Sequence, residues 1–304
     1  SGASNVPVMG LMAAWFTRQR RGLAAGVAVT GSSFALILLG PLVPRALAAG
    51  GAEGWRLCWF GYGAVTLALA VLALVVLRNA PADVGRLPLG GAAPPVADGP
   101  APALRWATVY RSRAIWLLGG VYVAFGFSYI IYVTFFTKYL IAEGGYTAAE
   151  AGGLFMTVGW CSLGCGLLWG SVSDAIGRRG ALCIVYLIHT VAFALFALWP
   201  EPAGFTLSAV LFGLSAWSIP AIVAAACGDL LGPRLAPAGL GFVTLFFGVG
   251  QAAGPSVAGL VADATDSLAP AMLLAAAVAL VGAVGSLLLR PAPPDLVHNL
   301  EEQP

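Results

Sequence analysis

An acid and two arginines lie close together in a short segment that separates two apolar stretches. Asp174 precedes Arg178 by four residues, and Arg179 follows directly. A carboxylate and a guanidinium at this spacing can form a charge-assisted ion pair, which positions segments and does not catalyse. We expect a tight turn whose ion pair latches one conformation of the protein; the alternative is a basic turn that only fixes topology. The candidate latch residues are Gly170, Asp174, Gly177, Arg178, Arg179 and Asp229.

A stripe of aromatic residues runs through the apolar segment 114–137. Its members recur every three or four positions, so they share one face of a helix. A tyrosine hydroxyl deep in a bilayer needs a partner, so this face is predicted to look into protein or water. An aromatic packing stripe is the alternative. The stripe consists of Tyr122, Phe125, Tyr129, Tyr132 and Phe136, with Ser128 beside it.

A second polar face lies on 237–262, where Thr244, Phe247 and Gln251 follow the same spacing. An amide near the bilayer midplane is costly unless it is satisfied. Gln251 therefore either binds substrate or bridges helices, and both interpretations stay open. Other polar or aromatic residues at matching depth complete the candidate substrate-binding set. The set is Ser33, Ser128, Tyr129, Tyr132, Trp160, Trp217, Ser218, Thr244 and Gln251.

The remaining reactive side chains do not form a catalytic or metal centre. His189 lies near the middle of 181–199, where a proton relay competes with a neutral, hydrogen-bonded histidine; we favour the second. Cys161 and Cys165 lie one helical turn apart, without a histidine or an acid nearby, and are read as small packing residues. We therefore predict no metal, no cofactor and no enzyme activity, because an enzyme would cluster such groups at one depth.

Composition places these residues in a membrane. The 304 residues are 60% hydrophobic and 9% charged, whereas soluble domains carry about 25% charged residues. The sequence has no basic patch interleaved with aromatic residues, so we expect no nucleic-acid partner. A membrane helix needs about 20 apolar residues. Eight segments meet this need and predict an all-α polytopic protein with the lipid bilayer as its partner. They are 22–44, 55–78, 114–137, 148–170, 181–199, 204–229, 237–262 and 268–290.

Basic residues predict the orientation. If the helices alternate, twelve of the 15 Lys and Arg residues fall on one side and only Arg45, Arg56 and Lys138 on the other. The positive-inside rule then places the 170–180 turn, the loop 79–113 and the tail 291–304 in the cytoplasm. The bias toward arginine and alanine favours a bacterial source and hence the inner membrane.

A proline-rich linker and a weak internal repeat divide the chain. Residues 79–113 are rich in Pro, Gly and Ala and are read as a flexible linker without a helix. At an offset of 214 residues, Thr30 matches Thr244, and a Gly-Pro pair recurs. Proline kinks a helix, so paired weak points at the same depth suit alternating access. The predicted hinge residues are Gly40, Pro41, Gly254 and Pro255.

The repeat predicts two related helix bundles. Residues 114–290 then form a complete six-helix bundle, and residues 1–78 form a partial one that contains the end of a fourth helix, represented by the short apolar piece 5–17, followed by a fifth and a sixth. On this basis we expect about three and a half further helices before Ser1 and expect them to be required for function.

The turn and its flanks resemble the major facilitator superfamily of secondary transporters. The pattern G-x-x-x-D-x-x-G-R-R from Gly170 to Arg179 is similar to the superfamily's loop between its eighth and ninth helices, with Ala175 where a basic residue is common. Residues 18–26 resemble the turn between its fourth and fifth helices. Residues 250–259, followed by Asp263, resemble the eleventh helix of the branch that includes monocarboxylate and oxalate–formate porters.

The resemblance implies a two-bundle transporter with a central cavity lined by the seventh helix, here 114–137. It implies a small-molecule substrate, which we expect to be a small organic acid or similar metabolite, moved with proton coupling. A drug/proton antiporter is the alternative within the class, although Pro44 stands where its glycine motif would place glycine. A non-transporting membrane sensor or a membrane enzyme is the alternative from another class.

Overall fold

The computed structural model describes residues 7–8, 11–12, 15–16, 18–89 and 106–289, and every element named within them is a helix. This confirms the predicted all-α chain. The elements are α2 (Arg18–Gly50), η1 (Gly51–Glu53), α3 (Gly54–Val76), η2 (Pro81–Val84), α4 (Ala107–Arg111), α5 (Arg113–Ala142), α6 (Ala148–Ser162), α7 (Cys165–Ile176), α8 (Arg178–Leu198), α9 (Pro202–Gly213), α10 (Ser218–Thr265) and α11 (Ala269–Leu287).

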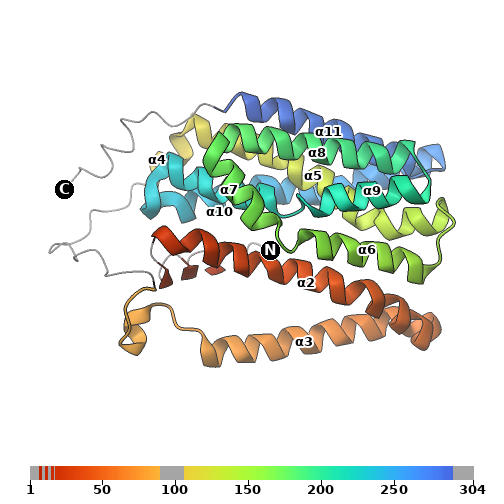
Figure 1. The fold of residues 1–304 in the computed structure, drawn as a ribbon, viewed down its shortest axis with the longest axis horizontal. Coiled ribbons are helices and arrows are strands. Elements are labelled where there is room, and N and C mark those ends of the chain that lie inside the picture. The colour runs from red at the N-terminus through yellow and green to blue at the C-terminus, as the bar shows by residue number, and fades with distance from the viewer. Residues whose placement is uncertain (1–6, 9–10, 13–14, 17, 90–105, 290–304) are drawn as a thin grey trace.

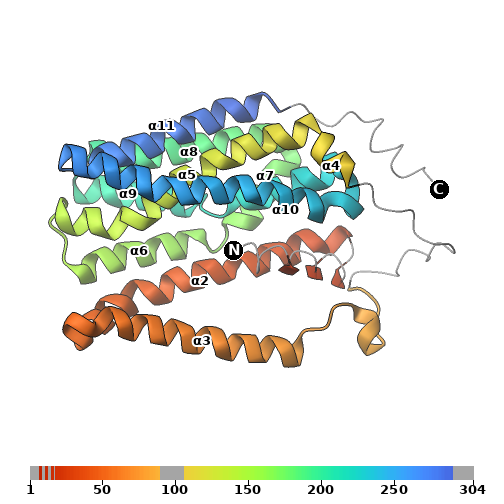
Figure 2. The same ribbon diagram turned by 180° about the vertical axis from the view of Figure 1, so that it is seen from behind.

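The long helices lie side by side along one direction (Figures 1 and 2). Helix α5 packs against α10 and α11, α8 packs against α11 and α9, and α6 packs against α9. The hairpin of α2 and α3 lies along one side of this bundle, with α2 against α6. Helix α3 is the outermost element, and Gly54 is its one buried residue.

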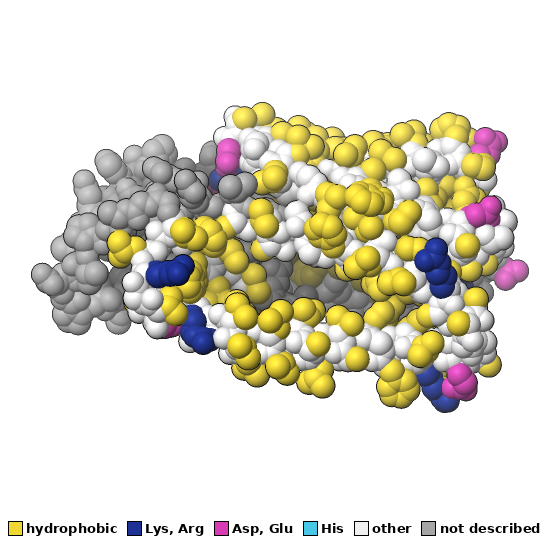
Figure 3. Space-filling view, turned by 60° about the horizontal axis from the view of Figure 1, so that its bottom comes forward, with side chains coloured by type: hydrophobic (Ala, Val, Ile, Leu, Met, Phe, Trp, Pro, Cys, Tyr) yellow, Lys and Arg dark blue, Asp and Glu magenta, His cyan; other side chains and the backbone are white. Residues whose placement is uncertain are grey.

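Length and composition make this bundle a membrane structure. Six helices are long and apolar enough to cross a bilayer, or seven if the bent pair α6–α7 forms one span. One of the six, Val27–Val76, comprises α2 from Val27 onward and all of α3, which Figure 1 shows as a hairpin. Each of the eight predicted segments therefore has a helical counterpart. On the face seen in Figure 3, charged side chains lie toward the two ends, and hydrophobic side chains cover the band between them.

Two predicted spans are interrupted near their middles. Helices α6 and α7 meet at an angle of 44° across Leu163 and Gly164. The segment predicted at 204–229 is divided by turns at 214–217, between α9 and α10. The turn predicted between 229 and 237 is a single non-helical residue, Gly232 (φ 72°), inside α10. Gly239 lies against Leu231, so the limbs of α10 on either side of Gly232 run back along each other.

The linker differs from the prediction at its ends. Pro81–Val84 and Ala107–Arg111 form short helices, η2 and α4, where the sequence suggested none. Proline at the first position of η2 fits because its missing N–H would have no partner there. Residues 90–105, the tail 291–304 and most of the piece 5–17 lie outside the described residues.

The predicted hinge glycines are positions of close helix contact. Helix α2 continues through Pro41 and Pro44 without a break. A Cβ at Gly40 would lie 2.5 Å from the carbonyl oxygen of Gly152 on α6, so the two backbones touch there. A Cβ at Gly254 would lie 2.8 Å from the Phe127 carbonyl oxygen on α5, and α10 likewise passes Pro255 unbroken. Small residues let membrane helices approach closely, and the breaks in this fold lie elsewhere.

Candidate functional site

A polar pair joins the middle of α5 to the middle of the second limb of α10, the part that follows Gly232. The Gln251 side-chain amide donates a hydrogen bond to the Tyr129 hydroxyl. Both residues are half-buried. The Tyr129 ring stacks on Phe125, with ring centroids 4.7 Å apart, and on Phe247, 5.8 Å away. Aromatic rings thus hold the hydroxyl in place, and the helix-bridging interpretation of Gln251 describes this conformation.

Tyr132 does not share that environment. Its side chain is 1% exposed, and its hydroxyl hydrogen-bonds to the Ser208 hydroxyl at 2.7 Å. Ser208 in turn donates to the carbonyl of Ala192 on α8. The ring packs among Phe193, Phe196 and Phe212. The expectation that Tyr132 faces a cavity is therefore wrong for this conformation, because one turn along α5 the stripe rotates from the polar pair into the aromatic core.

Three predicted hydroxyls are satisfied by backbone carbonyls close to them in the sequence. Ser128 donates to Phe125 at 3.4 Å, Thr244 donates to Leu240 at 2.7 Å, and Ser218 donates to Ser215 at 2.5 Å. Each acceptor is a backbone carbonyl three or four residues earlier, a common arrangement for such hydroxyls in membrane helices. The structure does not bring these three residues together with Gln251 through any hydrogen bond.

Ser33 lies at a contact between α2 and α6. The Ser162 hydroxyl donates to the Ser33 hydroxyl at 2.8 Å, and both residues are fully buried. Ser162 is the last residue of α6, directly before the bend. In this conformation Ser33 therefore contacts the end of α6 and does not line an open cavity across from Tyr129, contrary to our expectation.

The two predicted tryptophans differ in environment. Trp160 on α6 is 57% exposed. Trp217 immediately precedes α10, beside the interruption that follows α9. Its indole N–H is buried and has no hydrogen-bond partner among the described residues. A buried donor left unpaired costs free energy, so the Trp217 N–H is a candidate to bind an acceptor from outside the chain.

His189 is fully buried in an aromatic environment. Its ring lies 5.3 Å from Phe212 and 5.6 Å from Phe193, between centroids. It faces the backbone of Ser215, but neither ring nitrogen makes a hydrogen bond with a described residue. The hydrogen bond that we expected for this ring has no partner among the described residues, whereas the apolar surroundings suit an uncharged ring.

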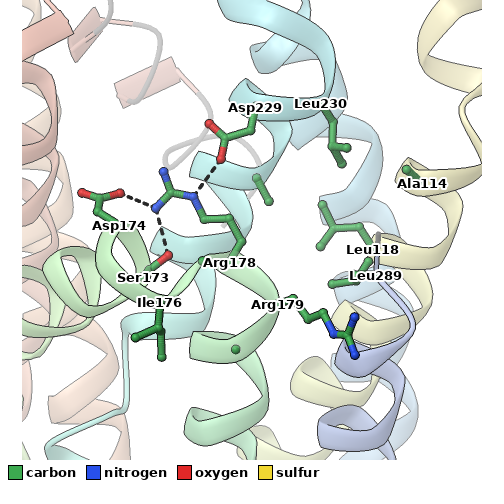
Figure 4. Close-up of a pocket in the computed structure, with 13 residues that line it drawn as sticks. Ala114, Leu118, Ser173, Asp174, Ile176, Arg178, Arg179, Asp229, Leu230 and Leu289 are labelled. Atoms are coloured by element: carbon green, nitrogen blue, oxygen red, sulfur yellow. Dashed lines mark hydrogen bonds and ion pairs between the residues drawn. The ribbon is translucent and has the colours of Figure 1, made fainter. Parts of the chain in front are cut away.

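The charged turn forms a compact ion-pair cluster (Figure 4). Arg178 donates through Nε to Asp229 at 2.8 Å and through Nη1 to Asp174 at 2.5 Å and to Ser173 at 2.9 Å. Gly177, with φ 84°, makes the turn that puts Arg178 at the start of α8. In this backbone region a side chain would be strained.

The cluster connects α7, α8 and α10. Its acids are more than half exposed, and the Arg178 side chain is 26% exposed. Arg179 points away from the acids, toward Leu289 (Figure 4), and forms no ion pair among the described residues. Gly170 has open space around it and does not enter the cluster. Of the candidate latch residues, Asp174, Arg178 and Asp229 thus meet in ion pairs beside Gly177, whereas Arg179 and Gly170 do not take part; the latch role stays a prediction.

Sequence reasoning missed the two helix interruptions and the contacts that support them. The Trp169 indole N–H donates to the Leu214 carbonyl at 2.9 Å, which satisfies a backbone group left free between α9 and α10. A Cβ at Gly213 would lie 2.7 Å from the Cβ of Cys161, so the two interruptions adjoin. The signals were Gly164 and Gly213, which we counted as parts of continuous helices.

These features define a polytopic helical membrane protein with polar groups between apolar helices and a charged turn at one end, as in a transporter. The chain belongs to the family described as "Uncharacterised MFS-type transporter YbfB", whose model matches residues 2–287. It is a multi-pass integral membrane protein of the major facilitator superfamily, and its family and relatives are transporters and not enzymes.

Two curated relatives resemble most of the chain. "Monocarboxylate transporter 11" of Homo sapiens is 29% identical over 293 residues, which cover 91% of this chain and 58% of the relative. "Probable galactarate/D-glucarate transporter GudP" of Bacillus subtilis (strain 168) is 23% identical over 317 residues, which cover 92% of this chain and 65% of the relative. The chain thus spans less than two thirds of either relative's length.

A solved structure shares the fold. The crystal structure of a variant of the E. coli fucose:proton symporter FucP superimposes with a TM-score of 0.62 at 14% sequence identity, covering 94% of this chain and 73% of that chain. At this identity the likeness concerns the fold alone, and it confirms the predicted major-facilitator architecture.

Proposed function

We propose that the protein is a secondary active transporter that moves a small organic carboxylate by alternating access, with protons as the coupling ion. The observation that carries the proposal is the Gln251–Tyr129 pair, a half-buried amide and hydroxyl between two apolar helices. Polar groups at such depth need protein, water or ligand as partners. The names of both curated relatives specify carboxylates, which supports the substrate class.

Neutral donors recognise the carboxylate in this proposal. Lys138 lies near the end of α5, and Arg178 lies at the start of α8. Between the ends of the bundle the candidate donors are the Tyr129 hydroxyl and the Gln251 amide, and, at the interruption directly before α10, the N–H of Trp217, which has no partner among the described residues. A carboxylate accepts hydrogen bonds from such groups more strongly than a neutral acceptor does.

Alternating access supplies the conformational step. The α2–α3 hairpin meets the rest of the bundle mainly through α2 and α6, where Gly40 touches Gly152 and Ser33 bonds Ser162. If α2 and α6 separate at the Gly40–Gly152 end, the interior opens there. From the distribution of basic residues we infer that this end faces outside and that the Arg178 cluster faces the cytoplasm of a bacterial inner membrane.

Uptake into proteoliposomes tests the proposal. A monocarboxylate, an aldarate and the neutral sugar fucose are offered with an acidic exterior, with and without a protonophore. We expect uptake of one carboxylate that the protonophore abolishes, and no fucose uptake. Gln251→Leu removes the amide at similar volume and is expected to raise KM at least about tenfold, within the range for hydrogen bonds to charged groups.

Three results would contradict the proposal. Proton-driven export of a lipophilic cation without carboxylate uptake would identify a drug antiporter. Carboxylate binding without any flux would identify a sensor. Flux unaffected by the protonophore or by an imposed pH gradient would remove proton coupling and leave the substrate class standing.

A further inference from the structure

A cavity of about 660 Å³ lies at the end of the bundle that carries the charged turn. Its wall is formed by the starts of α5 and α8, by the ends of α7 and of the first limb of α10, and by Leu289, which follows α11. Apolar side chains make up one part of this wall and the Arg178 cluster another (Figure 4). The apolar lining residues are Ala114, Leu118, Ile176, Ala226, Leu230 and Leu289.

Two arginines border the cavity, and among the described residues only Arg178 forms ion pairs. Arg178 uses Nε and Nη1 for Asp229, Asp174 and Ser173. Arg179 lines the same cavity on the side of Leu289 and has no ion pair among the described residues. The cluster of one arginine and two aspartates carries one net negative charge, so an anion is attracted to the Arg179 side and repelled from the other.

We propose that this cavity binds an anionic phospholipid, with its phosphate on Arg179 and the start of an acyl chain along Leu118, Leu230 and Leu289. A guanidinium binds phosphate through paired N–H groups. The apolar wall favours a lipid over free phosphate, because a small anion gains nothing from apolar surface. The positive-inside rule puts this end at the cytoplasmic leaflet, where anionic lipids attract basic residues near the surface.

The proposal predicts a charge-selective and position-specific lipid interaction. Dioleoylphosphatidylglycerol is titrated into the detergent-solubilised protein, and the first bound lipid is measured by native mass spectrometry. Dioleoylphosphatidylcholine and inorganic phosphate serve as comparison ligands. We expect the protein to bind phosphatidylglycerol at least about fivefold more tightly than phosphatidylcholine, the scale of one basic residue near a lipid surface.

Arg179→Gln should weaken the first phosphatidylglycerol-binding event by about fivefold and leave phosphatidylcholine binding unchanged. Arg111→Gln is the matched control, because Arg111 lies on α4 at the same end and does not line the cavity. Ala114→Phe tests the apolar wall without removing charge. It should weaken phosphatidylglycerol binding by filling the cavity, while the protein keeps the elution profile of the folded form.

Three results would overturn the proposal. Equal losses in Arg179→Gln and Arg111→Gln would show that surface charge attracts lipid without a specific cavity. Equal affinity for phosphatidylcholine would remove the anionic requirement. Inorganic phosphate that competes with the lipid and gives the same thermal stabilisation alone would identify a small-anion site. None of these measurements depends on transport, so they test the cavity separately from the proposed function.

Discussion

Replacing Gly152 by alanine should force α2 and α6 apart at the end of the bundle that we propose to face outside, here called the outer end. A Cβ at Gly152 would overlap the carbonyl oxygen of Gly40 and lie 2.9 Å from Pro44 Cγ. Ordinary contacts begin near 3.4 Å, so the overlap with the carbonyl oxygen amounts to about 1 Å. The oxygen belongs to the backbone and cannot rotate away, so the helix itself must move.

The cost of this overlap sets the size of the effect. Overpacking a well-packed contact typically costs about 1–3 kcal/mol. If the strain is present only when the outer end is closed, the same free energy shifts the equilibrium toward the outward-open state by about 5- to 150-fold. Glycine-to-alanine replacement also favours helix formation by up to about 1 kcal/mol. Gly153→Ala shares that gain and meets nothing within 4 Å, so it is the matched control.

Distances between spin labels measure the shift. Labels are placed at Ala49, near the end of α2, and at Ala149, at the start of α6, in a background without native cysteines; both positions are exposed. We expect Gly152→Ala to add or enlarge a long-distance population that Gly153→Ala does not. Identical distance distributions in the two variants would show that the glycine contact does not hold the outer end closed, and the assignment of α2–α6 as the moving contact would fail.

Other perturbations follow from the same contacts. Asp174→Asn should lower turnover more than substrate affinity if the cluster acts on the conformational equilibrium; an unchanged turnover in a normally inserted protein would leave it as a topology signal. Arg178→Gln should lower the free energy of unfolding by roughly 1 kcal/mol, because it removes two partly exposed ion pairs. Glu53→Gln breaks the exposed pair with Arg56 at the other end and should lower the free energy of unfolding by less. Equal shifts in melting temperature for the two variants would contradict this prediction. Trp217→Phe should weaken substrate binding measured at equilibrium without lowering thermal stability, because the lost N–H has no partner among the described residues; unchanged affinity would remove Trp217 from the site.

The sequence predicted where helices lie better than where they break. Apolar length and charge placement depend on the bilayer alone, so the helix order and the grouping of Asp174 with Arg178 could be read directly. The interruptions at Gly164 and at 214–217 depend on tertiary partners. One of these partners, the Trp169 indole that satisfies the Leu214 carbonyl, lies 45 residues away in the chain.

Depth along a helix was a weak guide to the candidate site for a related reason. Tyr129 and Tyr132 are three residues apart on the same predicted stripe, yet one bonds Gln251 on α10 and the other bonds Ser208 on α9. A stripe about 100° wide contacts two neighbouring helices at once. Periodicity therefore identified the face that is buried, and only the packing of α9 and α10 decided which tyrosine is enclosed.

Residues that match in the internal repeat share a packing property but need not share a functional role. Gly40 and Gly254 match at an offset of 214 residues, and both turn out to be glycines at which another helix comes too close for a side chain. The contacting helices differ. Gly40 on α2 contacts α6, so this contact joins the α2–α3 hairpin to the rest of the bundle, whereas Gly254 on the second limb of α10 contacts α5. A close-packing glycine tolerates either arrangement because it requires only a nearby backbone. Of the two, only the Gly40 contact joins the segments that we propose to separate in alternating access, so the two positions are expected to differ when substituted. Alanine at the α2–α6 contact should alter the distance between the α2 and α6 labels. Gly254→Ala should lower thermal stability and leave that distance unchanged.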